Sequence, residues 1–277
     1  MKSASPIETL DQLALHTITT KPWPIAVAAT RYAAAGVKGI TVWRQALAGH
    51  DPQQVGEMLR ALDLTVVALC REGFFASAAS DERQAAIHRN LAAIDEASAL
   101  GAPLLVMVCG ADPRQSLQKS RMQIKTGLET VLEHAESVGV RLAIEPLHPM
   151  YADSRSAINT LKQANDLVEA IGSSDLGVAV DVYHVWWDSE LEEQIHRAGE
   201  MNALFAFHLC DWKTPEDLLN DRALMGDGCI PLRQIRSWME SAGFNGFHEV
   251  EIFSNRWWAS DQDQFLEKII AAYRTHC

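Results

Sequence analysis

The sequence predicts an α/β protein, a (β/α)8 barrel that forms a single domain over residues 1–277. Eight short apolar segments alternate along the chain with longer amphipathic ones, a pattern typical of consecutive βαβ units. The apolar segments lack the polar alternation of half-exposed strands, which indicates parallel strands covered on both faces. No G-x-G-x-x-G motif follows an early strand, and no Pro/Ser-rich linker divides the chain. A closed barrel is therefore favoured over an open Rossmann-type sheet.

Turn and capping residues separate these segments. Asp51-Pro52, Ser116 and Asp261 are typical helix starts, and glycines follow most of the helices where a left-handed cap is wanted, Gly172 and Gly199 among them. The predicted strands cover residues 13–18, 39–43, 64–70, 103–109, 140–145, 177–181, 203–209 and 247–253. The predicted helices cover residues 25–35, 52–63, 81–100, 116–138, 156–171, 189–198, 231–242 and 261–274.

The composition excludes several classes of protein. Thirty-six acidic residues against 24 basic ones give a net charge of −12, the opposite of what a nucleic-acid-binding surface needs. No apolar run has the length of a membrane span, and the first 21 residues lack the apolar core of a secretory signal. Five widely spaced cysteines fit neither a disulfide framework nor a zinc knuckle. A cytoplasmic protein with no membrane or nucleic-acid partner is expected.

The last four predicted strands each end in a side chain that can bind a metal. These residues are Glu145, Asp181, His208 and either Glu249 or Glu251. Because catalytic groups of such barrels lie at the carboxyl ends of the strands, the four side chains are expected to meet there. Small residues precede three of them on the same strand face, namely Ala143, Ala179 and Ala206.

A shared divalent cation would relieve the repulsion among such carboxylates. An oxygen-rich set with one imidazole suits Mn²⁺ or Mg²⁺, with Co²⁺ or Zn²⁺ as alternatives. Glu249 and Glu251 share a strand face, so alternation alone leaves both open. Glu251 is preferred because it is nearer the carboxyl end, and Glu249 is expected one layer deeper.

Four motifs together resemble the xylose isomerase-like TIM-barrel superfamily over essentially the whole chain. They are I-E-P at 144–146, D-x-x-H at 181–184, H-x-x-D at 208–211 and V-E-x-F at 250–253. Within this superfamily the chain resembles the sugar phosphate isomerase/epimerase group, which includes ketose 3-epimerases and inosose isomerases and dehydratases. The resemblance implies Glu145, Asp181, His208 and Glu251 as metal ligands and His184 as a substrate contact.

The chain departs from the ketose 3-epimerase pattern at two positions. Tyr151 stands where those enzymes have a second glutamate, and Thr214, preceded by Lys213, stands where they have an arginine. Endonuclease IV shares the fold, but its additional metal-binding histidines and acids are not evident here, and the acidic balance opposes DNA binding.

The expected reaction is isomerisation or epimerisation of a keto-sugar or a related polyol-derived ketone. Glu145 and Glu251 would move a proton through a metal-stabilised cis-enediolate. The same intermediate could expel a β-leaving group, so a dehydratase or lyase acting on a keto-sugar or keto-glycoside is one alternative. A non-catalytic sugar-binding subunit is another.

Further residues were assigned to substrate binding from their positions after the strands. Arg71 and Arg256 could clamp a carboxylate or phosphate, and Trp43 could stack on a sugar. His148, His184 or Lys213 could act as the acid beside a leaving group. His16 and the loop 225–228 are further candidates near the strand ends, where a structural role is equally open. The tryptophan pairs at 186–187 and 257–258 could line the pocket or a contact in a homo-oligomer.

Overall fold

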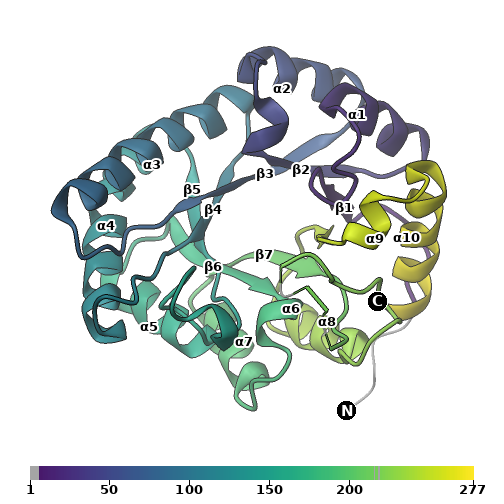
Figure 1. The fold of residues 1–277 in the computed structure, drawn as a ribbon. Coiled ribbons are helices and arrows are strands. Elements are labelled where there is room, and N and C mark those ends of the chain that lie inside the picture. The colour runs from purple at the N-terminus through teal and green to yellow at the C-terminus, as the bar shows by residue number, and fades with distance from the viewer. Residues whose placement is uncertain (1–5, 215, 218) are drawn as a thin grey trace.

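The computed structural model describes residues 6–214, 216–217 and 219–277. Eight parallel strands form a closed barrel in which each strand pairs with its neighbours in the sequence and β1 pairs with β8 (Figure 1). The helices surround this barrel, so the predicted fold is confirmed. The strands are β1 (Leu13–His16), β2 (Gly39–Trp43), β3 (Thr65–Gly73), β4 (Leu104–Val108), β5 (Arg141–Ile144), β6 (Leu176–Asp181), β7 (Leu204–Leu209) and β8 (His248–Val250).

The long outer helices are α1 (Ile25–Ala34), α2 (Pro52–Ala61), α3 (Ser80–Leu100), α4 (Leu117–Ser137), α5 (Leu161–Ile171), α7 (Leu191–Glu200), α8 (Leu232–Ser241) and α10 (Gln262–His276). The short ones are η1 (Arg44–Leu47), η2 (Pro149–Tyr151), α6 (Val182–Val185) and α9 (Asn255–Trp258). Asp51, Ser116 and Asp261 accept N-terminal backbone N–H groups as predicted, and Gly172 adopts the left-handed C-cap of α5.

Gly199 does not cap a helix, contrary to the prediction. It lies inside α7, which continues to Glu200 and is followed by Asn202 with a φ of 54°. A Cβ atom at position 199 would lie 2.3 Å from the carbonyl oxygen of Ala242. The glycine is therefore needed for the close approach of the chain after α8, and not for backbone conformation.

Several predicted boundaries were wrong where polar side chains follow the strands. β8 ends at Val250 instead of residue 253, and β1 ends at His16 instead of residue 18. The helix predicted from residue 156 begins at Leu161, because Ser156 forms an isolated bridge with Gly110 and Thr160 caps α5. β3 instead extends three residues further than predicted, to Gly73.

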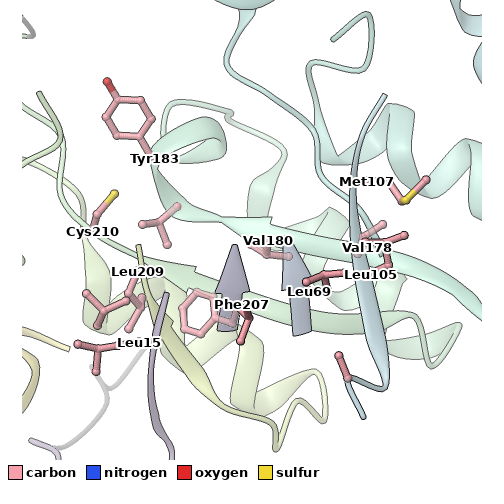
Figure 2. Close-up of a cluster of buried hydrophobic side chains, with 14 of the residues drawn as sticks. Leu15, Leu69, Leu105, Met107, Val178, Val180, Tyr183, Phe207, Leu209 and Cys210 are labelled. Atoms are coloured by element: carbon pink, nitrogen blue, oxygen red, sulfur yellow. The ribbon is translucent and has the colours of Figure 1, made fainter. Parts of the chain in front are cut away.

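Two apolar layers flank the barrel wall. Large side chains such as Ile144, Val180 and Phe207 pack outward between strands and helices, and Figure 2 shows Val180 and Phe207 among this outer layer. A smaller cluster fills the barrel interior and includes Ala143, Ala179 and Ala206, as expected from strand alternation. Small interior residues leave room at the carboxyl end of the barrel for polar side chains.

Across the described residues, no helix has both the length and the apolar character that crossing a membrane requires. Residues 1–5 of the segment examined for a secretory signal lie outside the described part of the chain.

Candidate active site

Four predicted residues converge at the carboxyl end of the barrel. Asp181 ends β6, His208 lies in β7, and Glu145 and Glu251 directly follow β5 and β8. One ligand atom from each lies within 4.8 Å of those from the others, and all four side chains are buried. We refer to Glu145, Asp181, His208 and Glu251 as the cradle.

Strand geometry explains why the cradle residues face one another. Glu145, Asp181 and His208 each follow an interior alanine by two positions, so they point to the same side of the barrel wall. The register pairs Asp181 with His208 and His208 with Glu249, which aligns the ends of β6, β7 and β8. Asp181 also accepts the backbone N–H of Tyr183 at 2.8 Å, which fixes its side chain at the start of α6.

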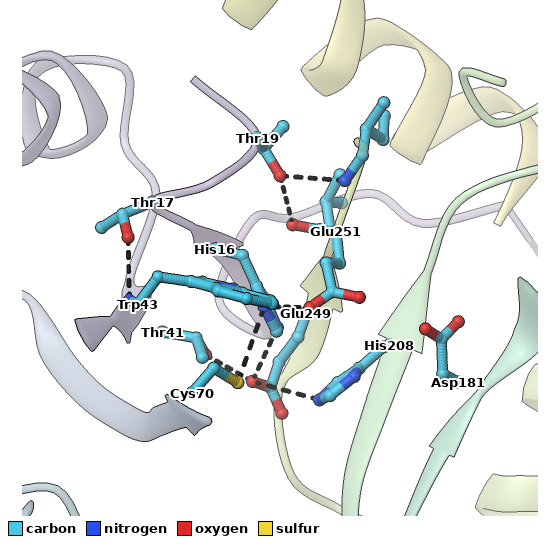
Figure 3. Close-up of polar contacts among 12 residues, drawn as sticks. His16, Thr17, Thr19, Thr41, Trp43, Cys70, Asp181, His208, Glu249 and Glu251 are labelled. Atoms are coloured by element: carbon cyan, nitrogen blue, oxygen red, sulfur yellow. Dashed lines mark hydrogen bonds and ion pairs between the residues drawn. The ribbon is translucent and has the colours of Figure 1, made fainter. Parts of the chain in front are cut away.

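A second polar layer lies beneath the cradle. His16 lies between Glu251 and Glu249, with Nδ1 2.8 Å from Glu251 Oε1 and Nε2 3.4 Å from Glu249 Oε2 (Figure 3). Thr41 donates its hydroxyl to Glu249, whose Oε2 also lies 3.9 Å from Nε2 of His208. Glu251 thus belongs to the cradle and Glu249 to the layer below it, and His16 faces the site.

Arg222 forms buried ion pairs with the cradle. Its Nη1 lies 2.9 Å from Asp181 Oδ2 and 2.7 Å from Glu251 Oε2. Its Nη2 lies 3.2 Å from Nε2 of His184, and its guanidinium packs on the ring of Tyr183 at 4.5 Å. Arg222 was not predicted, because the arginine of the ketose 3-epimerases corresponds to Thr214 and Arg222 lies eight positions further along, in a loop.

Asp211 anchors the loop that carries Arg222. Its carboxylate accepts backbone N–H groups of Gly226, Gly228 and Ile230 at 2.9–3.0 Å, and its own backbone pairs with Ala223. The aspartate of the H-x-x-D motif therefore holds a loop, and the loop 225–228 turns around it. Through Ala223, this anchor fixes Arg222 over the cradle.

The charges of the cradle carboxylates are coupled to their cationic neighbours. Burial raises the pKa of Asp181 to about 7, although Arg222 opposes the shift. Burial acts in the same direction on Glu251, but His16 and Arg222 outweigh it and hold its pKa well below the usual value. Glu251 is therefore the more strongly stabilised anion of the two.

The imidazoles of the site fall into two groups. Burial lowers the pKa of His16, but Glu251 and Glu249 outweigh this effect and raise it to about 9. For His208, the acidic neighbours likewise outweigh burial and raise the pKa to about 10. Burial and Arg222 instead hold the pKa of His184 well below its usual value, so this imidazole is neutral.

A cavity opens above the cradle. Of the residues predicted to bind substrate, Trp43, Arg71 and His184 line it. Tyr151, which replaces the second glutamate of the ketose 3-epimerases, lies in its wall together with Glu145, Glu251, Arg222, Val108, Leu147, Arg155, Leu219, Asn220 and Phe253.

The structure places the other predicted substrate contacts outside this cavity. Lys213 pairs with Asp221 at 2.8 Å, and Arg256 packs on the ring of Trp257. Lys213, which follows β7, and Arg256, which follows β8, both line a second surface hollow. Arg222 and Ala223 of the Arg222 loop also line this hollow. His148 stacks on Trp212 and reaches the site only through its backbone N–H, 3.3 Å from Nδ1 of His184.

A β-bulge turns Arg71 into the cavity. β3 and β4 pair at Cys70 and again at Glu72, which leaves Arg71 as the extra residue between them. Cys70 faces the barrel interior and Glu72 forms ion pairs with Arg44 and Arg89, so regular alternation would have pointed Arg71 outward. Its place just after the predicted end of this strand, at residue 70, was the useful signal, and the bulge within β3 supplies the orientation.

The cradle fits a divalent cation. Three carboxylates and one imidazole give a mixed oxygen and nitrogen donor set, and four donors within 4.8 Å match the ligand count of common metal sites. The fifth polar partner, Arg222, already supplies positive charge to two of these carboxylates. The same residues could therefore hold Mn²⁺, Mg²⁺, Co²⁺ or Zn²⁺.

Known proteins share this architecture. The chain is 42% identical to protein SMc04130 of Sinorhizobium meliloti 1021, over 97% of this chain and 99% of that one, with a TM-score of 0.93. It is 27% identical over 182 residues to an inosose isomerase of Halalkalibacterium halodurans. That match covers 63% of this chain and 61% of the relative, so the chain spans about three-fifths of that protein's length.

A further solved structure is the IolI protein with a bound zinc atom. It is 19% identical over 94% of this chain and 96% of its own, with a TM-score of 0.82, and this likeness concerns the fold. The family of xylose isomerase-like TIM barrels matches residues 29–271. This match covers most of the chain, including all four cradle residues, and the chain belongs to the xylose isomerase-like TIM barrel family.

Proposed function

We propose that this protein is a divalent-metal-dependent isomerase or epimerase of a keto-sugar or a related polyol-derived ketone. The observation that carries the proposal is the presence of two buried glutamates, Glu145 and Glu251, beside Asp181 and His208 at the floor of a cavity. The similarity to inosose isomerases supports the same substrate class. Mn²⁺ or Mg²⁺ is the proposed ion, and the zinc of the related IolI structure makes Zn²⁺ the alternative.

When bound, the cation would polarise the ketone carbonyl and stabilise the negative charge of a cis-enediolate. The residues of the chain divide the remaining work. Glu251 contacts two cationic groups, His16 and Arg222, whereas Glu145 contacts one imidazole, with His208 Nδ1 at 3.0 Å. Glu145 is therefore proposed as the proton acceptor, and in an isomerisation it would return the same proton to the neighbouring carbon. In an epimerisation, Glu251 would first take a proton from solvent and then deliver it from its own side of the substrate.

Two residues orient the substrate. Arg222 offers N–H donors next to Asp181 and Glu251, where a hydroxyl or carbonyl oxygen of the substrate would lie. His184 lines the cavity, and its contact with Arg222 Nη2 at 3.2 Å helps to hold that guanidinium in position. Trp43 and Phe253, whose ring centroids are 5.1 Å apart, provide apolar surface for the carbon face of a sugar.

Hydrogen exchange tests the proposal directly. The Mg²⁺-loaded protein is incubated in D₂O with inososes and with 2- and 3-keto-sugars, and the products are followed by NMR. Deuterium at an α-carbon of an intact skeleton is the expected result. Loss of water or of an aglycone would instead assign a lyase, and binding without exchange would assign a sugar-binding subunit.

A matched pair of variants locates the proton transfer. Glu145→Gln keeps the shape of the side chain and removes the base, so exchange should fall by about 10²–10⁴-fold. Glu129→Gln makes the same change on the exposed face of α4, where Glu129 pairs with Lys125, and should leave exchange unaltered. Full exchange in Glu145→Gln would refute the assigned role.

A further inference from the structure

Two arginines in the cavity wall form no ion pair with any carboxylate among the described residues. Arg71 and Arg155 both line the cavity above the cradle, and neither lies within ion-pair distance of a carboxylate in the described part of the chain. Nη1 of Arg71 is buried and makes no hydrogen bond there. Since a buried guanidinium donor without a partner is costly, these groups point to a ligand that is absent from the free protein.

Aromatic side chains hold the two guanidinium groups in place. Arg71 packs over the rings of Trp43 and Phe74, at 5.4 and 4.9 Å from the ring centroids. Arg155 lies 5.8 Å from the ring centroid of Tyr151, and its carbonyl accepts the N–H of Gly110. These contacts leave the N–H edges of the guanidinium groups available while they restrict side-chain motion, which lowers the entropic cost of binding.

The charges around the cavity indicate what kind of ligand Arg71 and Arg155 would bind. Arg222, the third arginine of the wall, pairs with Asp181 and Glu251 of the cradle. The positive charges of Arg71 and Arg155 have no such carboxylate among the described residues, and a neutral sugar would not compensate them.

We propose that Arg71 and Arg155 bind an anionic group of the substrate, a carboxylate or a phosphate monoester, while its ketone lies at the cradle. The proposal rests on the proposed function for the position of the ketone only. Guanidinium groups bind both oxyanions through paired N–H donors, so this chemistry is common to the two. Arg71 and Arg155 line the same cavity as Glu145 and Glu251, so one small ligand can contact both the guanidinium groups and the cradle.

Three small probes separate the two anions from a neutral polyol. Glycerol, D-glycerate and glycerol 3-phosphate share a three-carbon skeleton and differ in the neutral, carboxylate or phosphate end. Binding of each to the Mg²⁺-loaded protein is measured by calorimetry. We expect one of the two anions to bind at least tenfold more tightly than glycerol, and the preferred anion identifies the substrate as a sugar acid or a sugar phosphate.

Variants distinguish the arginines from the metal as the anion-binding group. Arg71→Gln and Arg155→Gln should each weaken anion binding about 10- to 100-fold, as expected for charge-assisted hydrogen bonds. Arg256→Gln removes the same charge from the rim of the barrel outside the cavity and should change binding less than twofold. Arg155 is partly exposed, so its variant remains informative if Arg71→Gln fails to fold.

Equal binding of the three probes, or anion binding that both arginine variants retain, would overturn the proposal. Its failure can be told apart from failure of the proposed function. Deuterium exchange into a neutral keto-sugar that is insensitive to Arg71→Gln would leave the isomerase intact and reject the anion site. Arginine-dependent anion binding without exchange into any keto-sugar would support the anion site and reject the proposed isomerase.

Discussion

Substitution of Arg222 by methionine removes the positive charge that holds two cradle carboxylates together. Nη1 lies 2.9 Å from Asp181 Oδ2 and 2.7 Å from Glu251 Oε2, and all three side chains are buried. Removing one partner of a buried ion pair costs about 3–5 kcal/mol, because the remaining charges stay uncompensated. For a protein of this size we expect the apo variant to melt about 6–20 °C below the wild type.

The expected decrease in the melting temperature of Arg222→Met depends on bound metal and on pH. A divalent cation replaces the missing charge, so saturating Mg²⁺ or Mn²⁺ should stabilise the Arg222→Met variant more than the wild type. The pKa of Asp181 is about 7, so its charge matters most above that pH. Thermal unfolding of both proteins, with EDTA and with metal, at pH 6 and pH 8, measures these effects.

Arg197→Met provides a matched control. Arg197 also contacts two carboxylates, Asp166 at 2.7 Å and Glu169 at 2.6 Å, but these pairs lie at the protein surface. Surface ion pairs contribute about 0–1 kcal/mol, and this variant should be insensitive to metal. Equal destabilisation of the two variants, or an equal gain from metal in Arg222→Met and wild type, would refute the reasoning.

Three other outcomes are expected. The pKa of His16 is about 9 in the folded state against 6.5 when unfolded, so its stabilising charge is complete below pH 6.5 and is lost as the pH rises through 9. Chemical denaturation of apo His16→Gln should therefore show a deficit of about 3 kcal/mol at pH 6 that largely disappears by pH 10. Asp211→Asn should speed amide hydrogen exchange at Gly226, Gly228 and Ile230, and unchanged protection would contradict the anchoring role. Mn²⁺ at about 100 times its Kd should raise the free energy of unfolding by about 2.7 kcal/mol, and Glu251→Gln should remove most of this gain at the same concentration.

The fold and the cradle could be predicted because each depends on local patterns. Each of these patterns can be recognised in one short stretch of sequence: continuous apolar strands, intervening amphipathic helices, and a polar strand end two residues after an interior alanine. The interior alanines are Ala143, Ala179 and Ala206. Strand alternation could not separate Glu249 from Glu251, because both face the interior. Glu249 lies within β8, and Glu251 follows its last residue, Val250, which places Glu251 nearer the carboxyl end of the barrel.

The remaining parts of the site depend on distant contacts that a single segment does not encode. Arg222 reaches the cradle through a loop anchored by Asp211, and Arg71 turns inward at a bulge defined by pairing with β4. Arg155 enters the wall because its segment bridges to Gly110. Lys213 and Arg256 follow β7 and β8, but the structure places both in a second hollow outside the cavity, which position along the chain does not reveal.

The cradle residues stand on or directly after strands, whereas Arg222 and Arg155 are carried by loops and Arg71 by an irregular strand end. Different mutations therefore change the two groups of side chains. A change in the length or sequence of a loop can alter which molecules bind in the cavity, while the strands that align the carboxylates and the imidazole stay in place. Substrate selectivity can therefore change among relatives of this chain while the strand positions of the four cradle residues stay the same.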